Sequence, residues 1–215
     1  MRVYLEIGKK AFASAADWPG WSRGGKTEDQ ALDSLLAYGE RYARAVAIPV
    51  GRLGPLTRAA VEMVERLEGN ATTDFGAPGV VPEMDRLPVS EKRLDDLIEL
   101  LRASWQAFEE SFAKAGGRRL GPSGPRGGGR TLDGIRRHVV EAQAGYLNAV
   151  GGRVAAGATW DVIEAGFVAA LHARARGELP EVGPRGGKRW PAPYAIRRSA
   201  WHALDHAWEI EDRLV

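Results

Sequence analysis

Hydrophobic and polar positions alternate along the first residues of the chain. Val3, Leu5 and Ile7 fall on one side of this alternation, and polar or amphipathic residues separate them. A period of two is typical of a strand with one buried face. Residues 11 to 16 favour a second strand, since the segment Asp17–Gly20 behind them contains a Pro-Gly pair, which turns prefer. The start of the chain is therefore predicted to form two strands.

The next group of apolar residues has the spacing of a helix. Thr27 offers its hydroxyl as an N-cap, and Gln30 stands three residues later in capping-box position. Apolar residues follow at helical intervals as far as Ala43. Residues 1 to 47 thus predict a ββα arrangement.

The pattern between residues 51 and 89 is open to more than one interpretation. Residues 61 to 67 fit a strand or a helix, whereas the segment from 69 to 88 is rich in Gly, Pro and Thr. We interpret that segment as a domain boundary or a long surface loop. The predicted organisation is a small α+β domain with a loop-rich tail over residues 1–85, followed by a helical domain over residues 86–215.

The second domain has the apolar period of amphipathic helices. Four are predicted: a stripe from Leu94 to Phe112 behind a Ser90 cap, a helix from about Thr131 to Val150, one from Thr159 to about Arg176, and one from near Pro193 towards Val215. Each has an apolar face that another element must cover, which favours an up-and-down four-helix bundle. The fold class predicted for the whole chain is α+β.

Composition argues against several classes of function. Thirty Lys and Arg against 28 Asp and Glu give a formal net charge of +2, which is too small to favour general binding to nucleic acid or to an anionic membrane. The sequence has no Cys, and no apolar stretch approaches the roughly 20 residues of a membrane span. We expect a soluble cytoplasmic protein, and 44% hydrophobic residues suffice for a substantial core.

Three histidines are the strongest chemical signal in the chain. His202 and His206 are four residues apart, so on a helix they lie one turn from each other on the same face. His138 lies at a similar depth in the second predicted helix, about 10 to 14 Å from its start by helical rise. Three neutral imidazoles leave one coordination position of a divalent ion open, which is typical of catalytic sites. The alternative is three core or rim histidines that bond to their neighbours.

Two carboxylates are candidates for the ring N–H groups of these histidines. Glu141 follows His138 by three residues, and Asp205 directly precedes His206. Metal-binding histidines commonly donate their second N–H to such a carboxylate. Both side chains are equally compatible with solvated positions on a helix surface.

Two connections between the predicted helices nearly repeat each other. Gly124–Arg130 reads GPRGGGR and Gly183–Arg189 reads GPRGGKR. In an up-and-down bundle both connections lie at the same end, before the two helices that carry the histidines. We therefore expect a rim that binds the anionic group of a substrate through four arginines: Arg126, Arg130, Arg185 and Arg189. The alternative is two flexible, solvated connections.

The surroundings of the histidines resemble a known family. The segments Ile135–Tyr146 and Ala200–His206 are similar to those of the DinB/YfiT-like family of four-helix-bundle metalloenzymes, over about residues 88 to 215. The resemblance implies that His138 and the pair His202 and His206 bind a divalent ion such as Zn, Ni, Mn or Fe. Many members follow the last histidine with Gly-Gln, whereas this chain has Ala-Trp-Glu, which changes the surroundings of the site.

The family also implies a type of reaction. Its members include S-transferases and isomerases that use low-molecular-weight bacterial thiols such as mycothiol or bacillithiol. We therefore expect thiol S-transferase or hydrolase-like chemistry on a small anionic substrate, with the metal ion as cofactor and such a thiol as a candidate second cofactor.

The first 47 residues resemble the small HicB-like antitoxin fold. In that fold the strands end in a Leu-Pro-Gly turn before a helix, and Asp17–Gly20 and Thr27–Ala31 match this order. The resemblance implies a module for packing or for formation of a homodimer. It also leaves an alternative function open: a non-catalytic protein-interaction or antitoxin-like module with a structural or vestigial metal site.

Overall fold

The computed structural model describes residues 1–122 and 129–215. The chain divides into two compact units, Met1–Leu87 and Pro88–Val215, and the boundary expected from composition lies close to this division. Among the residues described, none of the helices combines the length and the apolar character of a membrane span. The first unit is α+β, and the second is built from long helices.

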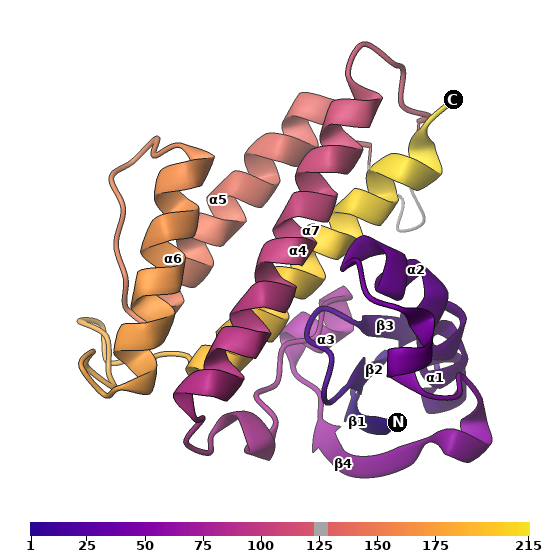
Figure 1. Cartoon of the computed structure of the whole chain (residues 1–215), viewed down its shortest axis with the longest axis horizontal. Helices are drawn as coiled ribbons and strands as arrows, with labels where there is room; N and C mark the ends of the chain where they lie inside the picture. Colours follow the sequence, from indigo (N-terminus) through magenta and orange to yellow (C-terminus); the bar gives the residue numbers. More distant parts are fainter. Residues whose placement is uncertain (123–128) are drawn as a thin grey trace. The chain divides into compact units, whose positions relative to one another are not determined.

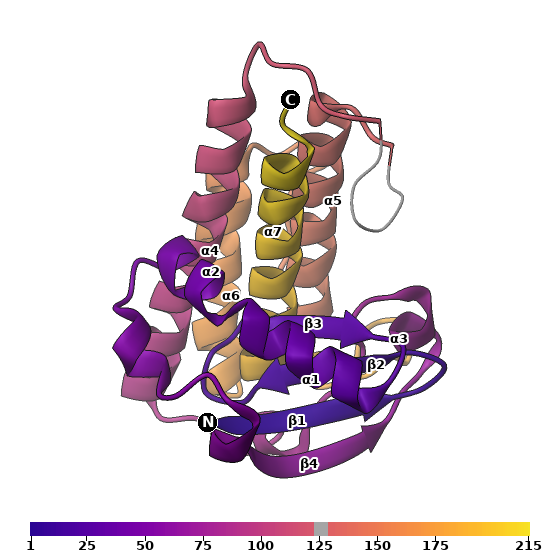
Figure 2. The same cartoon turned by 90° about the vertical axis from the view of Figure 1, so that its right-hand side faces the viewer.

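The first unit contains a mixed four-stranded sheet in the order β3-β2-β1-β4. Its elements are β1 (Arg2–Ile7), β2 (Ala11–Ala15), β3 (Ser22–Gly25), α1 (Glu28–Ala37), α2 (Gly39–Ala45), η1 (Val50–Leu53), η2 (Arg58–Ala60), β4 (Glu62–Glu68), α3 (Ala71–Phe75) and η3 (Glu83–Asp85). Neighbouring strands β1, β2 and β3 pair antiparallel, whereas β4 pairs parallel with β1. Figure 2 shows α1 lying across one face of this sheet.

The sheet is larger than the pattern predicted. The two expected strands are present as β1 and β2, but β3 was not expected, since a segment with two glycines has little strand propensity. The ambiguous segment 61–67 forms β4, whose hydrogen-bonding partner is β1 at the other end of the unit's sequence. Pairing with a neighbouring strand decided both elements, and for β4 that strand lies far away in the sequence.

The N-terminal cap of α1 has the predicted residues in a slightly different arrangement. The hydroxyl of Thr27 accepts a hydrogen bond from the backbone N–H of Gln30 at 3.2 Å. The side chain of Gln30 accepts one from the N–H of Lys26 at 3.1 Å. The two bonds together satisfy backbone donors at the start of the helix.

Glu6 lies on the side of β1 that was expected to face solvent, yet it is buried. One of its oxygens accepts hydrogen bonds from the hydroxyl of Thr73 at 3.2 Å, from the N–H of Gly79 at 2.7 Å and from the N–H of Val80 at 3.1 Å. A buried carboxylate needs such donors to offset its lost hydration. The segment read as a loop or boundary therefore folds back onto β1.

The second unit consists of four long helices, as the apolar stripes predicted. They are α4 (Glu91–Ala115), α5 (Leu132–Val150), α6 (Trp160–Ala175) and α7 (Ala192–Arg213). Their apolar faces meet in one core, in which the stripe of α4 packs on small and branched side chains of α5, α6 and α7. The resulting bundle of long helices appears in Figure 1.

The expected up-and-down order of the helices is wrong, because α5 and α6 run in the same direction (Figure 1). Near the end of α6, Arg174 donates to the carbonyl of Val150 at the end of α5 at 3.0 Å. At the start of α6, Trp160 packs against Phe108, far along α4. The connection 151–159 spans about 30 Å when extended, which suffices to return along a helix of 16 residues, about 24 Å long.

This order separates the two glycine-rich connections. The N–H of Gly121, after α4, donates to the carbonyl of Arg213 at the end of α7 at 2.7 Å. The N–H of Trp190, just before α7, donates to the carbonyl of Ala149 near the end of α5 at 2.9 Å. The first connection therefore lies where α5 begins and the second lies where α5 ends.

Candidate metal centre

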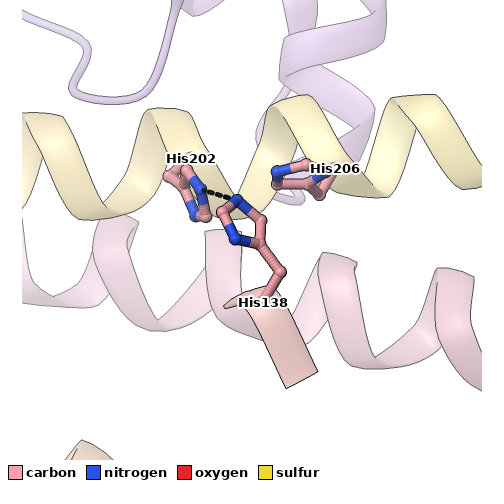
Figure 3. Close-up of side chains that lie close together, drawn as sticks. All are labelled: His138, His202 and His206. Atoms are coloured by element: carbon pink, nitrogen blue, oxygen red, sulfur yellow. Dashed lines mark hydrogen bonds between the residues drawn. The ribbon is translucent and has the colours of Figure 1, made fainter. Parts of the chain in front are cut away.

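The three predicted histidines come together between α5 and α7. Each offers one ring nitrogen, and these three atoms lie within 4.8 Å of one another. The Nε2 atoms of His138 and His202 are 3.2 Å apart. Figure 3 shows His138 reaching from α5 towards the two histidines of α7. These three side chains could hold a divalent metal ion.

The cluster depends on the close approach of the two helices. His202 and His206 stand one turn apart on α7, with ring centroids separated by 4.6 Å, and the ring of His138 lies 5.0 Å from each. The neighbouring positions Ala203 and Ala207 are buried in the core of the bundle. Because the distance between helix axes depends on the side chains at the contact, these alanines allow α5 to approach α7.

A buried polar network fixes the register of α5 against α7 beside the histidines. The hydroxyl of Ser199 donates to the side-chain carbonyl of Gln143 at 2.5 Å. The indole N–H of Trp105, on α4, donates to the same hydroxyl at 3.0 Å. Satisfied buried networks of this kind select one arrangement of the surrounding helices. Sequence reasoning missed these residues, which have no local signal.

His206 has a carboxylate partner that was not predicted. Its Nδ1 lies 2.8 Å from an oxygen of Glu209, and the other oxygen of Glu209 lies 2.8 Å from the guanidinium of Arg213. Because the carboxylate is an acceptor, Nδ1 carries the proton and Nε2 keeps its lone pair. The spacing of three and four residues along α7 is the signal that could have identified Glu209.

The two predicted carboxylates are placed differently. Asp205 is buried on α7, one residue before His206. Glu141 is exposed and lies on the solvent side of His138. For His206, the carboxylate that accepts the expected hydrogen bond from the ring N–H is that of Glu209.

The surroundings of His138 favour its neutral ring. Burial lowers the pKa of His138, and His206 and Arg130 lower it further, against the opposite effects of Glu141 and Glu209. Burial raises the pKa of Glu209, but its contacts with His206 and Arg213 outweigh burial and keep that pKa below its ordinary value. The neutral ring is the form that binds a metal ion, so the lowered pKa of His138 favours binding.

One side of the cluster opens to a cavity of about 350 Å³, which we call the histidine cavity. Its lining comes from the start of α5 and the residues before it: Arg130, Thr131, Gly134, Arg137, His138 and Glu141. His138 is partly exposed, whereas His202 and His206 are buried. Of the three rings, that of His138 lines the cavity, so a small molecule in the cavity approaches the cluster from the side of α5.

The predicted arginines that lie in the described part of the chain do not share one rim. Arg130 lines the histidine cavity. Arg185 and Arg189 belong to the other connection, which lies at the far end of α5. The guanidinium of Arg189 bonds the backbone and the side chain of Asn148. Arg126 lies outside the described residues. The expectation of a common rim was wrong because it assumed the up-and-down order of the helices.

Comparisons with known proteins add no assignment. No family model matches the chain, and neither a curated protein nor a solved structure matches it. The centre is therefore defined by its geometry: three histidines from two helices of a bundle, with access from one side.

Proposed function

We propose that this chain is a metal-dependent enzyme of the DinB/YfiT-like type, with thiol S-transferase or hydrolase-like chemistry on a small anionic substrate. The observation that carries the proposal is the convergence of three ring nitrogens within 4.8 Å beside a solvent-accessible cavity. A purely structural site would commonly close with a fourth protein ligand.

The residues present fit a divalent ion. His138, His202 and His206 would hold it, and imidazole suits Zn, Ni and Fe well. Glu209 orients the ring of His206 so that its Nε2 faces the other two histidines. Such an ion would supply Lewis acidity, which lowers the pKa of a thiol or water and provides a nucleophile at neutral pH.

Side chains of the histidine cavity would handle the substrate. Arg130 and Arg137 place positive charge at its mouth, where a carboxylate or phosphate group binds favourably. Glu141 stands on the same wall as His138 and is exposed, so it is placed to accept a proton from a group that enters the cavity.

The alternative function is a non-catalytic interaction module with a structural or vestigial metal site. It is favoured by the compact first unit, Met1–Leu87, which has its own sheet and helices and to which the proposed chemistry assigns no role. Phe75, at the end of α3, is 86% exposed and is a candidate contact for a protein partner.

Metal analysis of the purified protein separates the two functions. The protein is stripped with a chelator, reloaded with Zn, Ni, Mn or Fe in turn, and analysed for bound metal. We expect one ion per chain in the wild type and in His172→Ala, whose side chain lies outside the cluster and faces Asp95. His202→Ala should lose the ion.

Access to the ion is tested with cobalt as a spectroscopic substitute. Addition of a thiol such as mycothiol or bacillithiol should change the visible spectrum of the cobalt-loaded protein, and transfer of the thiol to electrophiles can then be assayed. Full metal occupancy in His202→Ala would disprove the site, and a cobalt spectrum that no thiol or anion changes would support the non-catalytic alternative.

A further inference from the structure

A groove of about 1190 Å³ runs along α5 away from the histidine cavity. We call it the α5 groove. It is bounded by Asp133, Glu141 and Asn148 on α5, by Arg153 in the connection before α6, and by Arg185 and Lys188 in the connection before α7. Arg137 and Glu141 line both the groove and the histidine cavity, so the two spaces adjoin.

The charges of the groove differ between its ends. Its two acidic side chains, Asp133 and Glu141, lie in the half near the histidines. The far end, where α5 terminates, has Arg153, Arg185 and Lys188 and no acidic lining residue among those described. An elongated ligand with one anionic group is therefore favoured in one orientation, with that group at the far end.

Three other basic residues line the groove: Arg136 and Arg189 already have partners, and Arg137 has the acidic residues Asp133 and Glu141 one turn before and after it on α5. The guanidinium of Arg136 lies 3.1 Å from the carboxylate of Glu109, and Arg189 bonds Asn148. The three basic residues of the far end are exposed, and no ion pair of theirs occurs in the described part of the chain. Their positive charge is available to a ligand.

The middle of the groove is lined by apolar side chains and a glycine. Val140 and Ala144 on α5 face Val154 and Ile163 on the other side. Gly145 lies between them, and a Cβ atom built there would meet nothing within 4 Å. Apolar walls bind the hydrocarbon or aromatic body of a ligand better than a chain of hydrated groups.

We propose that the α5 groove binds an elongated organic anion with an apolar body, whose anionic group meets Arg153, Arg185 and Lys188. From His138 to Ala149 the rise along α5 is about 16 Å, so such a ligand places its other end near the histidine cavity. The presentation of that end to a metal ion rests on the proposed function. Capture of the anion at the far end of the groove is independent of the proposed function.

The test uses a matched pair of fluorescent probes on the full chain. Anilinonaphthalene sulfonate has an apolar body and one anionic group, and phenylnaphthylamine is the same aromatic body without the sulfonate. The combined variant Arg153→Gln, Arg185→Gln and Lys188→Gln should bind the sulfonate about tenfold more weakly than the wild type, and added salt should reduce this difference. Its affinity for phenylnaphthylamine should not change.

Two further variants locate the binding. Lys114→Gln, Arg118→Gln and Arg119→Gln together remove the same charge from exposed positions outside the groove, and should leave the affinity for both probes unchanged. Gly145→Phe places a ring at a position where a Cβ atom meets nothing within 4 Å, and should weaken binding of both probes. The proposal is overturned if the two triple variants bind the sulfonate equally, or if Gly145→Phe binds both probes as the wild type does.

Metal content measured on the same samples keeps this test separate from that of the proposed function. The groove variants should retain one ion per chain, and His202→Ala should retain the charge-dependent difference between the two probes. If the groove variant binds the sulfonate as tightly as the wild type and both proteins contain one ion per chain, the groove alone is rejected. If the probes behave as expected and the wild type binds no ion, the metal site alone is rejected.

Discussion

The carboxylate of Glu209 lies 2.8 Å from Nδ1 of His206, one turn further along the same helix. The bond determines which nitrogen of the ring is left to bind an ion. We predict that Glu209→Gln weakens metal binding by roughly 10 to 100-fold, measured by competition with a chromophoric chelator. Glu99→Gln, on the exposed face of α4, is the control. An unchanged metal affinity in Glu209→Gln would show that the contact has no part in the site.

Arg213 links this carboxylate to the chain that precedes α5. Its side chain is 3% exposed, and it donates to Glu209, to the carbonyl of Gly121 and to the carbonyl of Arg130. Removal of one partner of a buried ion pair leaves the other charge uncompensated, so Arg213→Met should destabilise the fold by about 3 kcal/mol. Urea unfolding measures this loss, and Arg118→Met, at an exposed position, should cost far less.

The same variant should also loosen the connection between α4 and α5. Amide hydrogens near Gly121 should exchange faster in Arg213→Met than in the wild type, because two carbonyl contacts of the guanidinium are lost. If the amide hydrogens near Gly121 exchange only through global unfolding in Arg213→Met, other contacts hold this part of the chain in place.

The network of Ser199 is expected to stabilise the bundle. Ser199→Ala leaves the buried N–H of Trp105 and the amide of Gln143 without this hydroxyl, which costs about 1 to 3 kcal/mol. A double-mutant cycle with Gln143→Ala measures the coupling. Additive effects of the two changes would contradict a shared network.

Stability should depend on pH through Glu164 of α6. Burial raises the pKa of this carboxyl above its ordinary value of 4.5, although Arg102 opposes the change. A raised pKa in the folded state means that the protonated form is favoured by folding, so stability is lost as the pH rises through that pKa. Glu164→Gln should therefore be more stable near neutral pH.

The gain in Glu164→Gln should be less than about 1 kcal/mol, since the side chain is partly exposed and solvent screens it. It should disappear as the pH falls below 4.5, where the wild-type side chain is protonated in both states. Thermal unfolding at several pH values measures the difference.

Local signals predicted the helices of the second unit well. The cap residues Ser90 and Thr131 accept hydrogen bonds from Arg93 and Gly134, at 3.3 Å and 3.1 Å, where α4 and α5 begin. The four-residue spacing of the histidine pair identified the candidate ligands, because helical geometry alone places them on one face. These features depend on residues close in sequence.

Features that depend on distant segments could not be predicted in this way. The direction of α6 is set by contacts such as that of Arg174 with Val150, and nothing in the connection itself specifies it. Likewise, β4 joins the sheet through pairing with a strand some sixty residues earlier. Glu209 is different, because it lies only three residues from His206 on the same helix, and that spacing is a local signal that was not used.

The shared direction of α5 and α6 has an electrostatic consequence. Both helices end on the same side of the bundle, so the negative poles of two helix macrodipoles, each equivalent to about half an elementary charge, come together. Arg174 donates to the terminal carbonyl of Val150, and Arg189 to that of Asn148. Both arginines therefore offset the negative pole of α5, and Arg153, Arg185 and Lys188 add positive charge beyond what the end of that helix requires. Within the second glycine-rich connection, Arg189 thus serves as a cap of α5.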